Sequence, residues 1–452
     1  MKRPCPGTAS TGEDDPVTQP IEHPLDPPAP SASLTPPPNG SAGTAAQVLR
    51  ARNAVAVVFG LNGLAVASWF ARIPAAKEAL DLPVGRLGLV LISMSAGAVL
   101  AMATAGAISS RRGTGPVVAA STLLLAAGLL IAGGGAGLFG SVPVTVIGLA
   151  AIGYGSGTCD VAMNVQAALV ERRIGRTIMP RFHAAWSIGT VAGAGIGALT
   201  SRTGLPIQVH LALVAAVVLG GTLLAVRSFL SAATIADTAA PEPEAHPDDA
   251  APTGRSAALT AWTEPRTLLI GLLVLVMAFT EGTANDWIAV AFVDGHQVTE
   301  TGGAIVLGVF VTAMTLGRTV GTIALDRWGR VRVLIATMLL GAAGATVAVL
   351  AGSLAVAMIG VAAWGLGASL GFPVGMSAAA DDESRAAARV SVVALIGYTA
   401  FLAGPPVVGL LGDHVGILRA LLVVPILLIP ALALVPVSRP PAAPVRPDPA
   451  HL

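Results

Sequence analysis

Four charged residues lie deep within long apolar stretches of this sequence, namely Asp160, Glu281, Asp286 and Arg318. A charged side chain at the centre of a bilayer costs about 2.5–3.5 kcal/mol even on the scale that penalises it least, so such residues are candidates for function. Carboxyl groups shielded from water favour their protonated form and can load and release a proton. The three acids therefore predict an internal site that handles protons or a polar solute.

Two of these acids are followed four residues later by an asparagine, at Asp160 with Asn164 and at Glu281 with Asn285. In a helix this spacing places both side chains on one face. Asparagine amides supply hydrogen bonds to a cavity wall. Asn62, near the middle of an earlier apolar stretch, adds a third amide. We expect these residues to meet in a polar cavity.

Two further side chains, Trp186 and Asp286, complete the candidate site. Some of the site residues could have a structural role instead of a functional one. Trp186 can stack on a sugar ring or pack within a helix bundle, and Asp286 can line the cavity mouth or pair with backbone or water. Asp160 can also serve as a hydrogen-bonded structural carboxyl. The predicted proton-coupling or substrate-cavity residues are Asp160, Glu281, Asn164, Asn285, Asn62, Trp186 and Asp286.

The composition is that of an integral membrane protein. Hydrophobic residues make up 54% of the 452 residues and charged residues only 11%, whereas soluble domains carry about 25% charged residues. A net charge of +1 gives no electrostatic case for binding nucleic acid. The two cysteines, Cys5 and Cys159, exclude a disulfide framework. No histidine spacing predicts a metal site, and no nucleophile–base pair predicts an enzyme, so we expect neither metal nor cofactor.

Apolar stretches of about 20 residues recur along the chain, each long enough to cross about 30 Å of hydrocarbon. The predicted spans are 53–75, 86–108, 115–136, 142–168, 183–202, 208–230, 267–293, 302–324, 331–351, 353–377, 389–411 and 415–436. The predicted fold is all-α, with 12 transmembrane helices in two six-helix bundles. Its segments are a disordered Pro-rich tail (1–49), a first bundle (50–230), a linker (231–265), a second bundle (266–437) and a disordered tail (438–452).

The basic residues predict the orientation of these spans. If the N-terminus is cytoplasmic, the opposite side carries only Arg72, Lys77, Arg86, Arg202 and Arg419 of the 26 Lys and Arg residues. Basic residues gather on the cytoplasmic side of membrane proteins. Both termini and the linker are therefore predicted to be cytoplasmic. The preference for Arg over Lys, with high Ala and Gly, is typical of GC-rich bacterial genes, which indicates a bacterial plasma membrane.

Three patterns in the first half of the chain recur in the same order in the second half. Gly148–Gly155 and Gly360–Gly367 both read GxAAxGxG, 212 residues apart. The segment Ser110–Gly113 matches the segment that begins at Asp326, 216 residues later, and Asn62-Gly63 matches Glu281-Gly282. An internal repeat of this kind predicts two homologous, pseudo-symmetric six-helix halves.

With twelve spans in a 6+6 pattern and a Gly-x-x-x-Asp-Arg-x-Gly-Arg type loop after the second and eighth spans, the sequence resembles the major facilitator superfamily over roughly residues 50–437. The resemblance implies that this loop is a cytoplasmic latch, whose Asp caps a helix end and pairs with Arg across the gap between the halves. Ser110 replaces that Asp in the first half and Thr322 replaces the Gly in the second. The predicted latch residues are Gly106, Arg111, Gly113, Arg318, Asp326, Arg327, Gly329 and Arg330.

A finer resemblance, to the fucose permease-like branch, is carried by the segments 159–164 (CDVAMN), 182–189 (FHAAWSIG) and 281–287 (EGTANDW). It implies that Asp160 handles a proton or the substrate and that Asn164 contacts the substrate. It also implies that the first, fourth and seventh spans line the cavity. Fucose transporters of that branch carry an acid in the first span, where this sequence has Asn62, which cannot take up a proton.

These observations predict a secondary active transporter for a small polar solute, with sugars as one candidate class. Transport would proceed by alternating access and be coupled to protons, and the protein would act as a monomer in the lipid bilayer. The alternative is a drug or metabolite efflux transporter of the same fold. Antiporters of the superfamily that this sequence resembles often carry a Gly-Pro signature on the fifth span, and residues 181–205 contain no Pro. A pump for apolar compounds should have a cavity lined by aromatic residues, but these make up only 4% of the chain. Both observations disfavour that alternative. Substrate identity and transport direction stay open.

Overall fold

The computed structural model describes residues 40–175, 178–230, 260–381 and 385–439. All regular secondary structure in these ranges is helical, which confirms the predicted all-α class. Most of the two predicted tails and of the predicted linker lies outside the described residues. The first helix nevertheless begins at Gly40, inside the predicted tail. The described residues from 44 onward form one compact unit.

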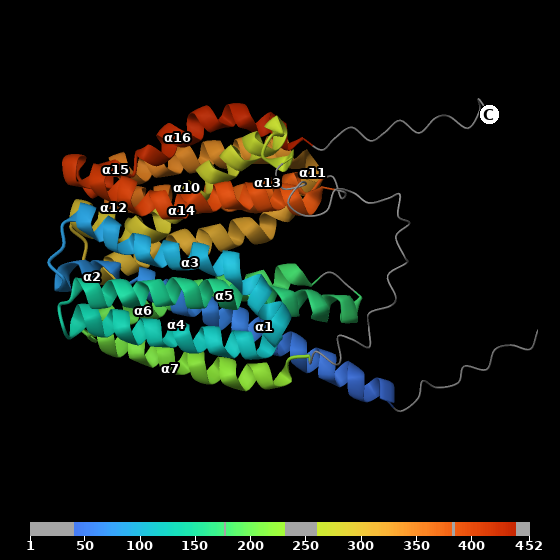
Figure 1. Cartoon of the computed structure of the whole chain (residues 1–452). Helices are drawn as coiled ribbons and strands as arrows, with labels where there is room; N and C mark the ends of the chain where they lie inside the picture. Colours follow the sequence, from blue (N-terminus) through green and yellow to red (C-terminus); the bar gives the residue numbers. More distant parts are fainter. Residues whose placement is uncertain (1–39, 176–177, 231–259, 382–384, 440–452) are drawn as a thin grey trace, which may run out of the picture. The chain divides into compact units, whose positions relative to one another are not determined.

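The first bundle contains six long helices, drawn in blue to green in Figure 1. They are α1 (Gly40–Phe70), α3 (Val84–Arg112), α4 (Thr114–Gly137), α5 (Val142–Ile174), α6 (Met179–Arg202) and α7 (Ile207–Ala225). The short helix α2 (Ile73–Ala79) joins α1 to α3, and the 3-10 turn η1 (Val226–Ser228) follows α7. Each predicted span of this half overlaps one long helix, although span 53–75 runs past α1 into α2 and span 208–230 runs past α7 into η1.

The second bundle holds the other six spans in helices that are less evenly divided. They are α10 (Pro265–His296), α11 (Glu300–Leu350), α12 (Leu354–Ala368), α13 (Gly371–Ala379), α14 (Ala386–Val415), α15 (Ile417–Ala420), α16 (Val423–Ala431) and the 3-10 helix η3 (Leu432–Ser438). The 51 residues of α11 would extend about 76 Å as one straight helix, too long for a single crossing. Gly329, with φ 76° and ψ 162°, breaks α11 into two spans.

The repeat predicted from sequence is present in the packing of the helices. A Cβ atom on Gly153 of α5 would collide with the carbonyl oxygen of Met94, and one on Gly365 of α12 would collide with that of Phe310. Both pairs lie at equivalent places of the two halves. Small residues let membrane helices approach closely. Each copy of the GxAAxGxG pattern therefore makes the same close helix contact in its own half. The fold is therefore the predicted pair of pseudo-symmetric six-helix bundles.

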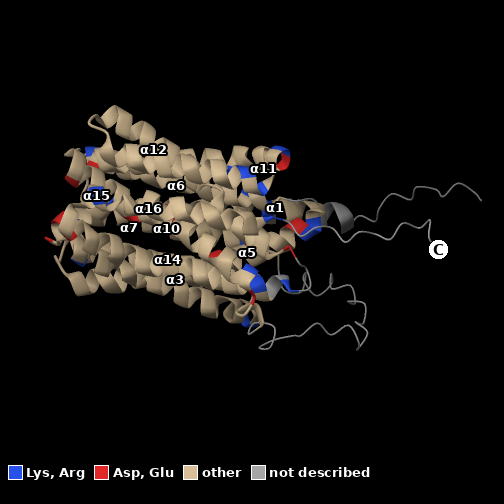
Figure 2. Ribbon diagram, turned by 90° about the horizontal axis from the view of Figure 1, so that it is seen from above, with Lys and Arg blue, Asp and Glu red and all other residues tan. Residues whose placement is uncertain are grey.

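Charged residues lie mainly at the two ends of the helices, and the middle is largely uncharged (Figure 2). We name these ends by the short helices near them. The α2 end holds α2, the start of α11 and the end of α14. The α13 end holds α13, the start of α10 and the break at Gly329. The two bundles meet chiefly through α3 against α14 and α6 against α11.

Candidate functional site

Asp160 and Asn164 lie on one face of α5, as their spacing predicts. The Asn164 amide Nδ2 donates to the Asp160 carboxyl Oδ1 at 3.2 Å and to the Asp160 backbone oxygen at 2.8 Å. Both side chains are half-buried. Asp160 lies within Coulomb range of Tyr398 on α14 of the second bundle. The carboxyl therefore faces the other bundle from the middle of a membrane helix.

Asn62 of α1 is held against the same helix one turn away from Asp160. Its Oδ1 accepts a hydrogen bond from Ser156 Oγ at 3.0 Å, and the side chain is 3% exposed. The next residue, Gly63, lets α1 touch the backbone oxygen of Trp186 on α6, where any Cβ would collide. The half-buried Trp186 packs against the core cluster of this bundle. This position fits the packing alternative for Trp186.

Glu281 of α10 forms an ion pair with Arg318 of α11. Arg318 Nη2 lies 2.8 Å from Glu281 Oε2, and its Nε donates to the Ser369 backbone oxygen at 3.3 Å. The Arg318 side chain is 28% exposed and the Glu281 side chain is 13% exposed. Arg318 also lies within Coulomb range of His183 on α6. The pair therefore lies on the side of the second bundle that faces the first.

The structure places Arg318 away from the other predicted latch residues. A helix rises about 1.5 Å per residue, so Arg318 lies about 16 Å before the break at Gly329. At that depth its partner is Glu281, in the same part of the bundle as the candidate cavity residues. Arg318 therefore belongs with the intramembrane charges. Its depth in the membrane could be predicted from the sequence, but its pairing with Glu281 could not.

Asn285 and Asp286 are half-buried on α10. Neither side chain forms a hydrogen bond or ion pair with another residue in the described ranges. Asn285 shares a face with Glu281, but Glu281 pairs with Arg318 instead. Asp286 precedes Trp287, whose side chain is fully buried. The structure thus brings Asn62, Asp160 and Asn164 together in one bundle and Glu281 and Arg318 in the other.

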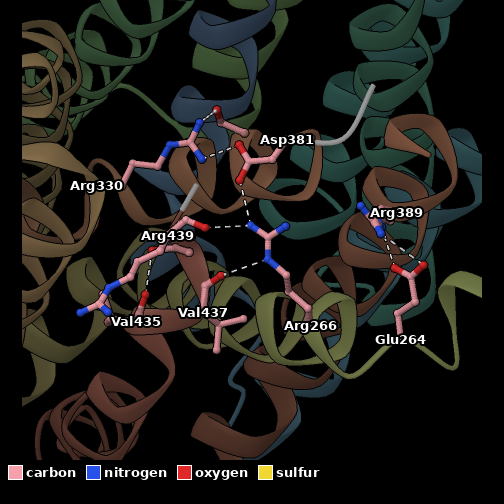
Figure 3. Close-up of polar contacts among 10 residues, drawn as sticks. Glu264, Arg266, Arg330, Asp381, Arg389, Val435, Val437 and Arg439 are labelled. Carbon is pink, nitrogen blue, oxygen red and sulfur yellow. Dashed lines mark hydrogen bonds and ion pairs between the residues drawn. The ribbon is translucent and has the colours of Figure 1, made fainter. Parts of the chain in front are cut away.

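At the α13 end, Arg330 forms an ion pair with Asp381 of its own bundle, and not with an acid across the gap between the halves. Arg330 Nη1 lies 2.6 Å from Asp381 Oδ1, and Arg266 Nη2 lies 2.9 Å from Asp381 Oδ2 (Figure 3). Arg266 also donates to the backbone oxygens of Val437 and Arg439. Sequence reasoning missed Asp381, although an acidic Asp-Asp pair after the tenth span marked the position.

The remaining latch residues are not joined as predicted. Asp326 and Arg111 are exposed and form no ion pair within the described part of the chain. The Arg327 guanidinium lies 5.9 Å from the ring centroid of Trp328. Gly106 faces open space. Gly113 and Gly329 adopt φ of 80° and 76°, a region that favours glycine, and so end the two equivalent spans alike. Asp326 has no ion-pair partner among the described residues, so its pairing with Arg stays a prediction.

Glu264, which precedes α10, forms a second ionic cluster at the α13 end. Its carboxylate lies 2.6 Å from Arg389 Nε (Figure 3). It also lies 3.0 Å from Arg385 Nη1 and accepts a hydrogen bond from Thr267 at 2.9 Å. The hydrogen bond from Arg389 is the main reason that the pKa of Glu264 is lowered to about 2. The carboxylate is therefore better stabilised in the folded protein than in the unfolded chain.

This cluster predicts a stability that falls in acid. Because the pKa of Glu264 is lower in the folded protein than in the unfolded chain, its carboxylate stabilises the fold fully at pH values above 4.5. This stabilisation is lost as the pH falls from 4.5 toward 2. Glu264→Gln should therefore lower the thermal midpoint at pH 7, and the difference from wild type should shrink below pH 4.5. Thermal unfolding in detergent between pH 7 and 3 measures this. Asp326→Asn, at an exposed and unpaired acid of the same end, is the control. An equal change in both variants would contradict the prediction.

Comparisons with known proteins agree with the fold and the repeat. A family profile described as Major Facilitator Superfamily matches residues 283–451. An uncharacterized MFS-type transporter of Yersinia pestis is 31% identical over 360 residues, which cover 79% of this chain and 88% of that protein. The membrane protein MosC of Rhizobium meliloti is 27% identical over 373 residues, covering 82% of this chain and 85% of MosC.

Solved transporter structures share the architecture at low sequence identity. The nucleoside transporter NupG has a TM-score of 0.67 at 13% identity, covering 85% of this chain and 98% of NupG. The transporter FucP in the outward conformation has a TM-score of 0.59 at 15% identity, covering 87% and 99%. The many apolar helices, the repeated packing and the Yersinia relative lead to one conclusion: this chain is a multi-pass membrane protein that belongs to the major facilitator superfamily of transporters.

Proposed function

We propose that the protein is a proton-coupled secondary active transporter that moves a small polar solute by alternating access. The observation that carries the proposal is the half-buried carboxyl of Asp160 in the middle of α5. It is hydrogen-bonded to Asn164 and faces the second bundle. An intramembrane carboxyl that contacts a cavity has the chemistry to exchange a proton during each transport cycle.

The proposed coupling uses carboxyl groups on both bundles. Asp160 belongs to the first bundle and Glu281 to the second. A proton on Glu281 removes the charge that holds Arg318, and this frees guanidinium donors toward the space between the bundles. A proton on Asp160 removes a charge that otherwise favours contact with water. Protonation can shift the conformational equilibrium because the two conformations solvate these groups differently.

A polar solute fits the side chains that surround these acids. Asn62, Asn164 and Asn285 offer amide donors and acceptors, which recognise hydroxyl groups. Two structures with this fold carry titles that name a fucose:proton symporter and a nucleoside transporter. Both solutes are small and rich in hydroxyl groups. These likenesses support sugars and nucleosides as the first solutes to test.

We also propose that the α13 end faces the cytoplasm of a bacterium and that one chain forms the transport unit. Arg111, Arg112, Arg327, Arg330 and Arg332 all lie at this end. Basic residues favour the cytoplasmic side. The proposed orientation puts the Asp381 and Glu264 clusters on the cytoplasmic side. It puts α2 on the opposite side of the membrane.

The transport proposal is tested with purified protein in vesicles that enclose a pH-sensitive dye. Hexoses, deoxyhexoses, sugar acids and nucleosides are added from outside, one at a time. We expect one of these classes to acidify the interior, since the solute would enter together with a proton. Folded protein that gives no signal with any of them would contradict import by symport. Export of preloaded drugs and metabolites would then be measured.

The Glu281–Arg318 pair predicts a stability defect that a second substitution repairs. Glu281→Gln leaves a partly buried guanidinium without its counter-charge, which should lower the free energy of unfolding by about 1–3 kcal/mol. Glu281→Gln with Arg318→Gln removes both charges and should recover most of the loss. Thermal unfolding of the two single variants and the double variant measures the coupling. Additive losses in the double variant would show that the pair contributes no stability.

A further inference from the structure

Polar contacts between the two bundles gather at the α2 end. Arg72, between α1 and α2, lies 2.8 Å through its Nε from Glu300 Oε1 at the start of α11. The Arg72 side chain is only 4% exposed. Its two other nitrogens donate within the first bundle, to Thr200 Oγ1 at 3.3 Å and to the Leu205 backbone oxygen at 3.0 Å. Arg72 is thus fixed to the first bundle and presents one edge to the second.

Further contacts between the bundles lie at the same end. Lys77 of α2 lies 2.8 Å from Asp294 of α10. The Gly85 backbone N–H, in the first turn of α3, donates to Asp413 Oδ1 of α14 at 2.9 Å. No side chain of its own bundle caps α3. A carboxylate at a helix N-terminus is favourable, so the second bundle supplies the cap that α3 lacks.

The ionic clusters at the α13 end have a different topology. Asp381 binds Arg266 and Arg330, and Glu264 binds Arg385 and Arg389. All six residues belong to the second bundle. Among the described residues, the ion pairs that join the two bundles are those at the α2 end. Separation of the bundles at the α13 end would leave its clusters intact, whereas separation at the α2 end would break Arg72–Glu300 and Lys77–Asp294.

We propose that Arg72 is a gate residue, whose ion pair with Glu300 holds the α2 end closed and sets the balance between the two transport conformations. The proposal rests on the alternating access of the proposed function. Only an interaction that differs between two states can shift their equilibrium. The contacts of Arg72 with Thr200 and Leu205 lie within one bundle and persist in both states. The pair with Glu300 exists only when the α2 end is closed.

The experiment measures the separation of the α2 end directly. Spin labels are placed at Phe139 and Gly352, in exposed loops of the first and second bundles at this end, after replacement of Cys5 and Cys159 by Ser. Distances are measured by pulsed electron resonance in lipid, without solute or pH gradient. Arg72→Glu should raise the ratio of separated to closed protein by about tenfold, which corresponds to about 1.4 kcal/mol.

Three further variants separate gating from general damage. Arg72→Glu combined with Glu300→Arg restores opposite charges and should return the ratio toward that of wild type. Arg72→Gln, which removes the charge without reversing it, should give an intermediate ratio. Arg419→Glu reverses the charge of an exposed residue at the same end and should change nothing. An unchanged ratio in folded Arg72→Glu, or no recovery in the charge-swapped double variant, would overturn the gate. A failure of proton coupling would leave these distances unaffected.

Discussion

Asp160→Asn is expected to abolish solute-driven acidification of the vesicle interior. Asparagine keeps the size of the side chain and can still hydrogen-bond to Asn164, but it cannot carry a proton. Transport of the solute down its own gradient should continue, because the amide side chains of Asn62, Asn164 and Asn285 are unchanged. The measurement compares acidification with uptake of radiolabelled solute in the same vesicles.

Two controls make the Asp160 result specific. Asp160→Glu retains a carboxyl and should retain acidification, although at a changed rate because the carboxyl moves by one methylene. Asp81→Asn removes an exposed acid that forms no ion pair among the described residues, and it should leave both measurements unchanged. Full proton-dependent uptake by Asp160→Asn combined with Glu281→Gln would rule out both carboxyl groups as the proton carriers.

Gly153→Ala is expected to be among the most damaging single substitutions in the chain. The new Cβ would collide with the Met94 backbone oxygen, and neither helix backbone can yield without moving a whole span. Overpacking of this kind costs about 1–3 kcal/mol and sometimes more. The higher helix propensity of Ala, about 1 kcal/mol, offsets only part of this. Thermal unfolding in detergent should show a clearly lower midpoint and a poorer yield of folded protein.

The chain offers matched controls for Gly153. Gly365→Ala, at the equivalent contact of the second half, would meet the Phe310 backbone oxygen and should cause a similar loss. Gly106→Ala, on a helix face with open space, should be neutral or slightly stabilising. Equal midpoints for Gly153→Ala and Gly106→Ala would show that helix α5 does not depend on the close contact.

Local patterns in the sequence predicted the features that depend on one helix or on two neighbouring helices. The four-residue spacing of Asp160 and Asn164 was enough to predict that they share a face, because helix geometry fixes it. The repeated glycines predicted two equal bundles, because close helix contacts require small residues. The break at Gly329 fell between two predicted spans, where a hydrophobic pattern must stop.

Contacts that depend on the docking of distant elements could not be predicted in this way. Arg318 had a predictable depth, but its rotation toward Glu281 is set by how α11 packs on α10. Asp381 replaced Asp326 as the partner of Arg330 because the end of α13 approaches the break in α11. Arg72 and Glu300 come from different bundles and are 228 residues apart, so only the assembled protein joins them.

Because Asp413 caps α3 from the other bundle, the first turn of α3 is more stable when the bundles are docked than when they are apart. When the bundles touch, the amide of Gly85 is satisfied by a carboxylate from the other half of the molecule. When they part, that amide must turn to water, and the first turn of α3 loses the electrostatic support of a negative charge. Fraying of this turn is thus thermodynamically linked to domain motion. The free energy that favours the docked arrangement therefore includes the ordering of the first turn of α3.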